Sequence, residues 1–92
     1  MKMEIIKMPE QFSVQEAAKF RDMTYNLLAG SPTSFELDFT ACYFIDSTGL
    51  GVLVGLYKKC KEMNCNVVLK HLHKDVARVF SMTRLDQIFT IL

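Results

Sequence analysis

The sequence predicts an α/β fold with about four strands in a mostly parallel sheet and helices packed on it. Short apolar segments typical of strands alternate with longer amphipathic segments typical of helices, in the order β-α-β-α-β-α-β. The links between these segments are short. Half of the 92 residues are hydrophobic, which is enough for one compact core. We therefore expect residues 1–92 to form a single domain.

The first third of the chain is predicted to be a strand followed by a helix. Residues 3–8 have the length and apolar content of a strand, and Pro9 ends it. Ser13 is a plausible N-cap, since Glu16 three residues later completes a capping-box pattern. Gly30 and Pro32 end the helix. The residues that recur at helical spacing along it are Val14, Ala17, Ala18, Arg21, Tyr25 and Leu28.

The middle of the chain predicts a strand, a turn and a second helix. Apolar and polar residues alternate over 35–39, as in a half-buried strand. Phe44 and Ile45 lead into the turn, and the helix is expected from about Ser47 to Met63. Asn64 suits the left-handed position after its end. The expected apolar stripe of this helix is Leu50, Leu53, Val54 and Tyr57.

The last third predicts a strand, a helix and a final strand. The β-branched residues of 66–72 are typical of a buried strand. The third helix is expected to open at Lys74 or Asp75, and the final strand to cover 88–92. The residues of the third helix expected to face inward are Val76, Val79 and Phe80.

Composition excludes several functional classes. The formal net charge is +1 and no block of lysine or arginine exists, so we expect no binding to nucleic acid. No apolar stretch reaches membrane-spanning length and no signal peptide is visible, so we expect a cytoplasmic protein without membrane insertion. The three cysteines are expected to be reduced thiols, buried or half-buried: Cys42, Cys60 and Cys65.

The most informative segment is Phe44-Ile45-Asp46-Ser47-Thr48-Gly49-Leu50-Gly51. An apolar strand stops at an acid, two hydroxyl residues and a glycine follow, and a helix begins at Ser47. A helix N-terminus exposes unpaired N–H groups and a partial positive charge, so a phosphate is stabilised there. The chain thus presents a hydroxyl group at a position where a phosphate would be tolerated.

Asp46 has two interpretations at this level. Its carboxylate suits an N-cap of the second helix, which alone would explain it. It would also suit a role in orienting the Ser47 hydroxyl, or in binding the metal-nucleotide of a kinase partner. Both interpretations remain open.

The remaining motifs do not predict an enzyme, a cofactor or a metal. Gly49, Gly51 and Gly55 form a GxGxxxG string, but Gly49 and Gly51 fall within the first turns of the helix, where small residues allow the helix start to lie close to the sheet or to a partner. No P-loop or nucleophile elbow is present. His71 and His73 have neither a close acid cluster to complete a metal site nor any evident approach to Ser47.

The Asp46-Ser47-Thr48-Gly49-Leu50 turn resembles the STAS family, the domain shared by sulfate transporters and anti-sigma factor antagonists. The resemblance extends from about Ser34 to Leu92 and implies a single STAS-like domain. One strand precedes the first helix where the family usually has two, so the first family strand is expected to be missing. Arg84 stands where the family frequently has glycine.

In stand-alone family members, a partner kinase that is also an anti-sigma factor phosphorylates the serine after this aspartate. The resemblance therefore implies an anti-sigma factor antagonist that is not itself an enzyme. It implies Ser47 as the phosphorylated residue, with Thr48 as the competing site. It implies as partners a serine kinase with a GHKL-type ATPase fold and a cognate phosphatase. The residues expected to shape the turn and bind the partner are Asp46, Thr48, Gly49 and Leu50.

Two further expectations concern interaction surfaces, and two alternative functions remain open. The docking rim is expected to be the exposed first half of the second helix with the loop 40–43. The free edge along 3–8 suggests a homodimer or partner docking. The alternative function is a STAS subunit of a larger lipid-transport ABC or stress-signalling complex, in which the turn docks without phosphorylation. A small nucleotide-binding or hydrolysing protein is the third hypothesis, and only the glycine string supports it.

Overall fold

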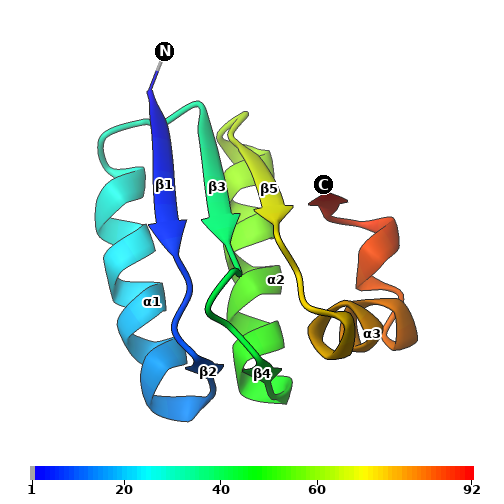
Figure 1. Ribbon diagram of the computed structural model, residues 1–92. Coiled ribbons are helices and arrows are strands. Elements are labelled where there is room, and N and C mark those ends of the chain that lie inside the picture. The colour runs from blue at the N-terminus through cyan, green and yellow to red at the C-terminus, as the bar shows by residue number, and fades with distance from the viewer. Residues whose placement is uncertain (1) are drawn as a thin grey trace.

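The computed structural model describes residues 2–92 and confirms the predicted α/β class. Its main sheet is entirely parallel, in the order β1-β3-β5-β6. Helices α1 (Val14–Leu28) and α2 (Ser47–Glu62) lie side by side behind this sheet in Figure 1. The strands are β1 (Met3–Lys7), β3 (Ser34–Asp38), β5 (Asn66–Lys70) and β6 (Thr90–Ile91).

A second, smaller parallel sheet lies beyond the carboxyl ends of β1 and β3 (Figure 1). It pairs β2 (Gln11–Phe12) with β4 (Phe44–Ile45), in the register Gln11 to Phe44 and Phe12 to Ile45. Two strands therefore precede α1, and the expectation of a single strand there was wrong, because a two-residue strand is too short to show an alternating pattern. This small sheet holds the segment that leads into α2.

The C-terminal elements are shorter than predicted. Strand β5 ends at Lys70 because His71 adopts a left-handed backbone with φ of 62°. Helix α3 (Lys74–Met82) opens at one of the two expected positions. A 3₁₀ turn, η1 (Leu85–Gln87), takes up the chain before the final strand, so β6 covers two residues where five were expected.

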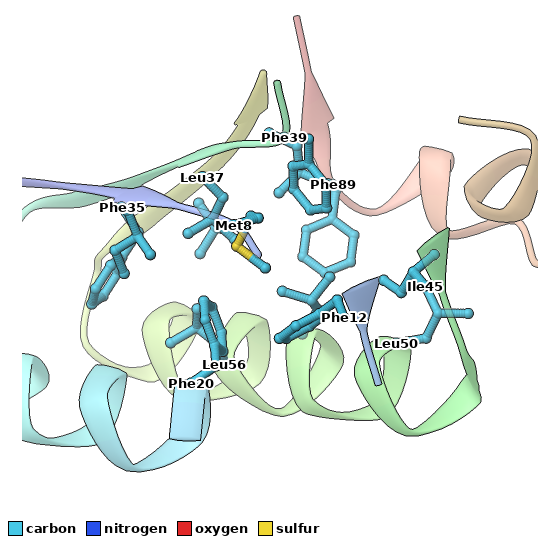
Figure 2. Close-up of a cluster of buried hydrophobic side chains, with 14 of the residues drawn as sticks. Met8, Phe12, Phe20, Phe35, Leu37, Phe39, Ile45, Leu50, Leu56 and Phe89 are labelled. Atoms are coloured by element: carbon cyan, nitrogen blue, oxygen red, sulfur yellow. The ribbon is translucent and has the colours of Figure 1, made fainter. Parts of the chain in front are cut away.

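The core fills the space between the sheet and the two helices (Figure 2). Helix α1 buries Ala17, Phe20, Thr24 and Leu28. The expected spacing was wrong at Val14 and Tyr25, which are 63% and 46% exposed. It was also wrong at Ala18 and Arg21, which are exposed. The stripe passes instead through Thr24, whose hydroxyl donates to the Phe20 carbonyl at 2.9 Å and so avoids an unsatisfied buried group.

The apolar stripe expected for helix α2 is correct in part. Leu50 and Leu53 are buried, and Val54 and Tyr57 pack partly against the core. Leu56 is a further inward position that was not predicted, and Cys60 is buried as expected for the cysteines. Asn64 follows the helix with φ of 55°, which confirms its expected left-handed position.

All three cysteines are buried free thiols, Cys42, Cys60 and Cys65. Burial raises the pKa of each, and for Cys60 to about 12. Such thiols are poor nucleophiles at neutral pH. Their burial agrees with the expectation of buried or half-buried thiols.

Strand β1 forms one edge of the main sheet (Figure 1). Within residues 2–92 it pairs with β3 alone. Met3 and Ile5, on the face of β1 opposite the helices, are 56% and 61% exposed. The free edge expected from the sequence therefore exists in the described part of the chain. In that same part of the chain, no helix combines the length and the apolar character needed to cross a membrane.

Candidate functional site at the start of α2

Asp46 is the N-cap of α2, which confirms the first of its two interpretations. Its backbone is extended, and its carboxylate accepts a hydrogen bond of 2.9 Å from the Gly49 N–H. Its carbonyl accepts the first helical bond, of 3.0 Å, from the Leu50 N–H. An aspartate in this geometry satisfies one of the donors that a helix start leaves free. The strand-to-helix turn is thus closed by local hydrogen bonds.

The two hydroxyl residues of the turn face outward. Ser47 and Thr48 are the first two residues of α2, and both are exposed. No side-chain hydrogen bond of the described chain engages the Ser47 Oγ atom. The structure therefore leaves both hydroxyl groups accessible at the positive end of the helix.

Gly49 and Leu50 face inward instead. Figure 2 shows Leu50 beside Ile45 and Phe12 at one end of the core. Leu50 is only 9% exposed, so the expectation that it contacts a partner does not fit its burial. Its side chain contributes to the turn by anchoring α2 in the core.

Gly49 is required by close packing. A Cβ atom added there would lie 2.8 Å from Cδ2 of Phe12 and 3.1 Å from Cγ1 of Ile45, and would also collide with the Phe12 carbonyl oxygen. Gly51 and Gly55 have open space around the same position. Close packing within the domain is therefore confirmed for Gly49, whereas Gly51 and Gly55 make no such contact in the described chain.

The loop 40–43 is held in place by polar and aromatic contacts. The Asp38 carboxylate accepts hydrogen bonds from the hydroxyl and the backbone N–H of Thr40, and these bonds lower the Asp38 pKa. The Tyr43 N–H donates to the Glu10 carbonyl at 2.9 Å. The Tyr43 ring stacks on His73, with ring centroids 4.0 Å apart and planes at 18°. The His73 ring also hydrogen-bonds the Thr40 carbonyl.

Two aromatic side chains stand out at this end of the molecule. Tyr43 is 64% exposed and Phe44 is 51% exposed. Sequence reasoning placed the loop 40–43 on the docking rim, but it treated Phe44 only as the end of a strand. Since only every second residue of a strand faces the core, the sequence indicates that either Phe44 or Ile45 is exposed, and the pairing of β4 with β2 decides which one.

The two histidines do not meet as ligands. His71 follows β5 in a left-handed conformation, and His73 precedes α3 as its N-cap. Among residues 2–92, no group of three or more histidine, cysteine or acidic side chains is placed to hold a metal ion.

The fold and the turn together define a class of small α/β domains in which an aspartate-capped helix start presents hydroxyl groups at the surface. The chain belongs to the STAS domain family, because the STAS domain profile matches residues 3–92. The family likeness is therefore broader than the sequence interpretation, which began it at Ser34.

One curated relative is an anti-sigma-B factor antagonist from Listeria monocytogenes, 38% identical over 55 residues. That match covers 60% of this chain and 48% of the relative, so it spans about half of the relative's length. A crystal structure of a Thermotoga maritima protein described as an anti-sigma factor antagonist superposes with a TM-score of 0.86 and 28% identity. The likeness covers 95% of this chain and 77% of that one.

The anti-sigma factor antagonist SpoIIAA, solved in its unphosphorylated form, shares the fold. Its TM-score is 0.75 at 15% identity, over 100% of this chain and 82% of that chain. At this identity the likeness concerns the architecture alone. The chain is thus a STAS domain similar to anti-sigma factor antagonists.

Proposed function

We propose that this chain is an anti-sigma factor antagonist that works as a phosphorylation-controlled interaction switch. It binds an anti-sigma factor when Ser47 is unphosphorylated and is released when Ser47 carries a phosphate. The observation that supports this most is the exposed Ser47 side chain at the first position of α2, beside the Asp46 cap. The similarity to anti-sigma factor antagonists supports the kind of partner.

The switch needs no rearrangement of the fold. Phosphorylation adds a charge of about −1.5 to −2 at neutral pH, and the start of a helix tolerates that charge. Asp46 already holds the Gly49 N–H, so a phosphate on Ser47 has no need to displace the cap and can remain at the surface. A partner with carboxylates on the facing surface would then be repelled, and the phosphate would resist desolvation in an interface.

The partner in this proposal is also the modifying enzyme. We propose a serine kinase with a GHKL-type ATPase fold that doubles as the anti-sigma factor, and a phosphatase that reverses the modification. The chain is then a substrate and not an enzyme, and it acts in the cytoplasm where sigma factors work.

Thr48 is the competing acceptor, since it is also exposed. Incubation with the kinase and ATP, followed by tandem mass spectrometry, separates the two sites. We expect the phosphate on Ser47 in the wild type and in Thr48→Ala, and no modification of Ser47→Ala. A phosphate found on Thr48 alone would overturn the assignment of Ser47.

A second candidate function is a STAS subunit that docks without phosphorylation, in a lipid-transport ABC or stress-signalling complex. The exposed Tyr43 and Phe44 favour it, because such a surface can bind a partner whatever the state of Ser47. In that case Ser47→Ala has no effect in the cell, and Phe44→Asp prevents assembly. Leu50→Asp is unsuitable for this test because Leu50 lies in the core.

We also propose self-association through the free edge of β1. The Met8 N–H bonds the Asp38 carbonyl beside β3, so by alternation the backbone groups of Met3, Ile5 and Lys7 point away from β3. A second β1 can pair with them in the antiparallel direction. Light scattering should then show a dimer at high concentration and a monomer for Ile5→Pro. A monomer at all concentrations would contradict dimer formation.

A further inference from the structure

A hollow of about 190 Å³ lies between β4 and α3, next to the proposed docking turn. The residues that line it are Tyr43, Phe44, Ile45, Asp75, Val76 and Val79. Phe44 precedes Ser47 by three residues, so the Cα atoms of these two residues lie at most roughly 11 Å apart. We call this feature the Asp75 hollow.

The walls of the Asp75 hollow are fixed before any partner arrives. One face of Tyr43 is stacked on His73, and the 64% exposure of Tyr43 leaves much of the remaining ring open. The backbone of Phe44 is held by the pairing of β4 with β2. Val76 is 1% exposed and anchors the first turn of α3 in the core. A preformed surface loses little conformational entropy when a partner binds.

Among residues 2–92, Asp75 is the one charged residue that lines the hollow. It lies in the first turn of α3, where the helix dipole favours a negative charge. Lys74 and Arg78 flank it on the same helix, yet within residues 2–92 no ion pair engages its carboxylate. A charged acceptor beside aromatic and aliphatic walls is therefore available to an incoming group.

Aromatic walls with a single carboxylate complement a cation that has a flat, weakly hydrated surface. A guanidinium group stacks on aromatic rings and pairs with a carboxylate through two parallel hydrogen bonds. An ammonium group is compact and strongly hydrated, so it would lose more solvation in the same place. Arginine is also enriched among the residues that dominate protein interfaces.

We propose that the Asp75 hollow receives an arginine side chain of the partner protein. The inference rests on the proposed function, because it gives the docking surface near Ser47 a defined contact. A phosphate on Ser47 would compete with Asp75 for the same guanidinium and draw the arginine from the hollow. Phosphorylation would then weaken partner binding in two ways, by moving this arginine out of the hollow and by general charge repulsion.

The test uses N-acetyl-arginine methylamide as the probe and its neutral, nearly isosteric citrulline analogue as the control, in NMR titrations of the ¹⁵N-labelled protein. We expect millimolar binding of the arginine probe, with the largest shifts at Tyr43, Phe44 and Asp75. The citrulline analogue should bind at least about fivefold more weakly. Equal affinity for the two probes, or shifts centred elsewhere, would overturn the inference.

Two variants separate the carboxylate from general surface charge. Asp75→Asn should abolish the preference for arginine, while Asp86→Asn, which removes an exposed acid outside the hollow, should retain it. Preserved amide spectra show that each variant folds. A preference that survives Asp75→Asn would contradict the assignment. The titration needs neither kinase nor phosphate, so a missing preference refutes the hollow alone, and an unmodified Ser47 refutes the proposed switch alone.

Discussion

The Asp46 carboxylate accepts a hydrogen bond of 2.9 Å from the backbone N–H of Gly49. The same glycine packs against Phe12 and Ile45 so closely that a side chain there would collide with both. The cap therefore forms where the helix start meets the small β2–β4 sheet. Between these two residues, Ser47 and Thr48 remain exposed to solvent.

The cap should contribute measurably to stability. Asp46→Ala removes the acceptor of the Gly49 N–H, so the free energy of unfolding should fall by about 1 kcal/mol. Urea denaturation followed by circular dichroism measures this difference. Asp22→Ala, at an exposed position of α1, is the matched control and should change stability by less than about 0.5 kcal/mol. Equal effects of the two substitutions would show that the cap contributes nothing specific.

Two glycines of the same helix should respond to alanine in opposite directions. Gly49→Ala forces a Cβ against Phe12 and Ile45, so it should destabilise the protein by about 1–3 kcal/mol. Gly51→Ala meets open space and gains helix propensity, so it should stabilise by about 0.5–1 kcal/mol. Thermal unfolding of both variants provides the measurement. A stabilising Gly49→Ala would contradict the close contact at the start of α2.

Arg84 holds a left-handed backbone, with φ of 61° and ψ of 16°. A residue with a side chain is strained in this region, whereas glycine is not. Arg84→Gly should therefore stabilise the protein by about 1 kcal/mol, and Arg84→Ala should not. Comparison of the urea midpoints of the two variants tests the point. A loss of stability in Arg84→Gly would indicate that the arginine side chain makes a compensating contact.

The buried thiols should resist labelling until the protein opens. Since burial raises the pKa of all three cysteines, the native protein should react with an aromatic disulfide reagent at pH 8 far more slowly than the urea-unfolded chain. The raised thiol pKa also determines how the stability of the protein changes with pH. For Cys60, with a folded pKa of about 12, the stabilisation is complete below the ordinary thiol pKa and is lost as pH rises toward 12. Rapid labelling of a native thiol would show that the core is open there.

The sequence allowed the helix start of α2 to be predicted correctly because capping is a local interaction. Asp46, Ser47 and Gly49 specify it within a few residues. The outward position of Val14 and Tyr25 was not predictable in the same way. It depends on which side of α1 packs against α2 and the sheet. The buried side includes the polar residue Thr24, so the hydrophobic pattern of the sequence does not identify it. Tertiary packing overrode the apparent pattern.

The exposed hydroxyl group of the site was predictable from the sequence, whereas the exposure or burial of the neighbouring apolar side chains was less so. The accessible hydroxyl of Ser47 follows from its place at the start of a helix. The exposure of Phe44 depends on β2, a partner strand of two residues more than thirty positions earlier in the chain. The burial of Leu50 follows from the same packing, since α2 rests its first turn against Phe12 and Ile45. Contacts of that separation leave no local pattern in the sequence.

The most direct test of the switch is the affinity of the cognate anti-sigma factor for the wild type, Ser47→Asp and Ser47→Ala, measured by isothermal titration calorimetry. Ser47→Asp should raise the dissociation constant more than ~10-fold, which is roughly 1.4 kcal/mol, with an unchanged circular dichroism spectrum. Ser47→Ala should bind like the unphosphorylated wild type. If folded Ser47→Asp bound as tightly as the wild type, a negative charge at this position would not control partner binding, and the proposed mechanism would be wrong.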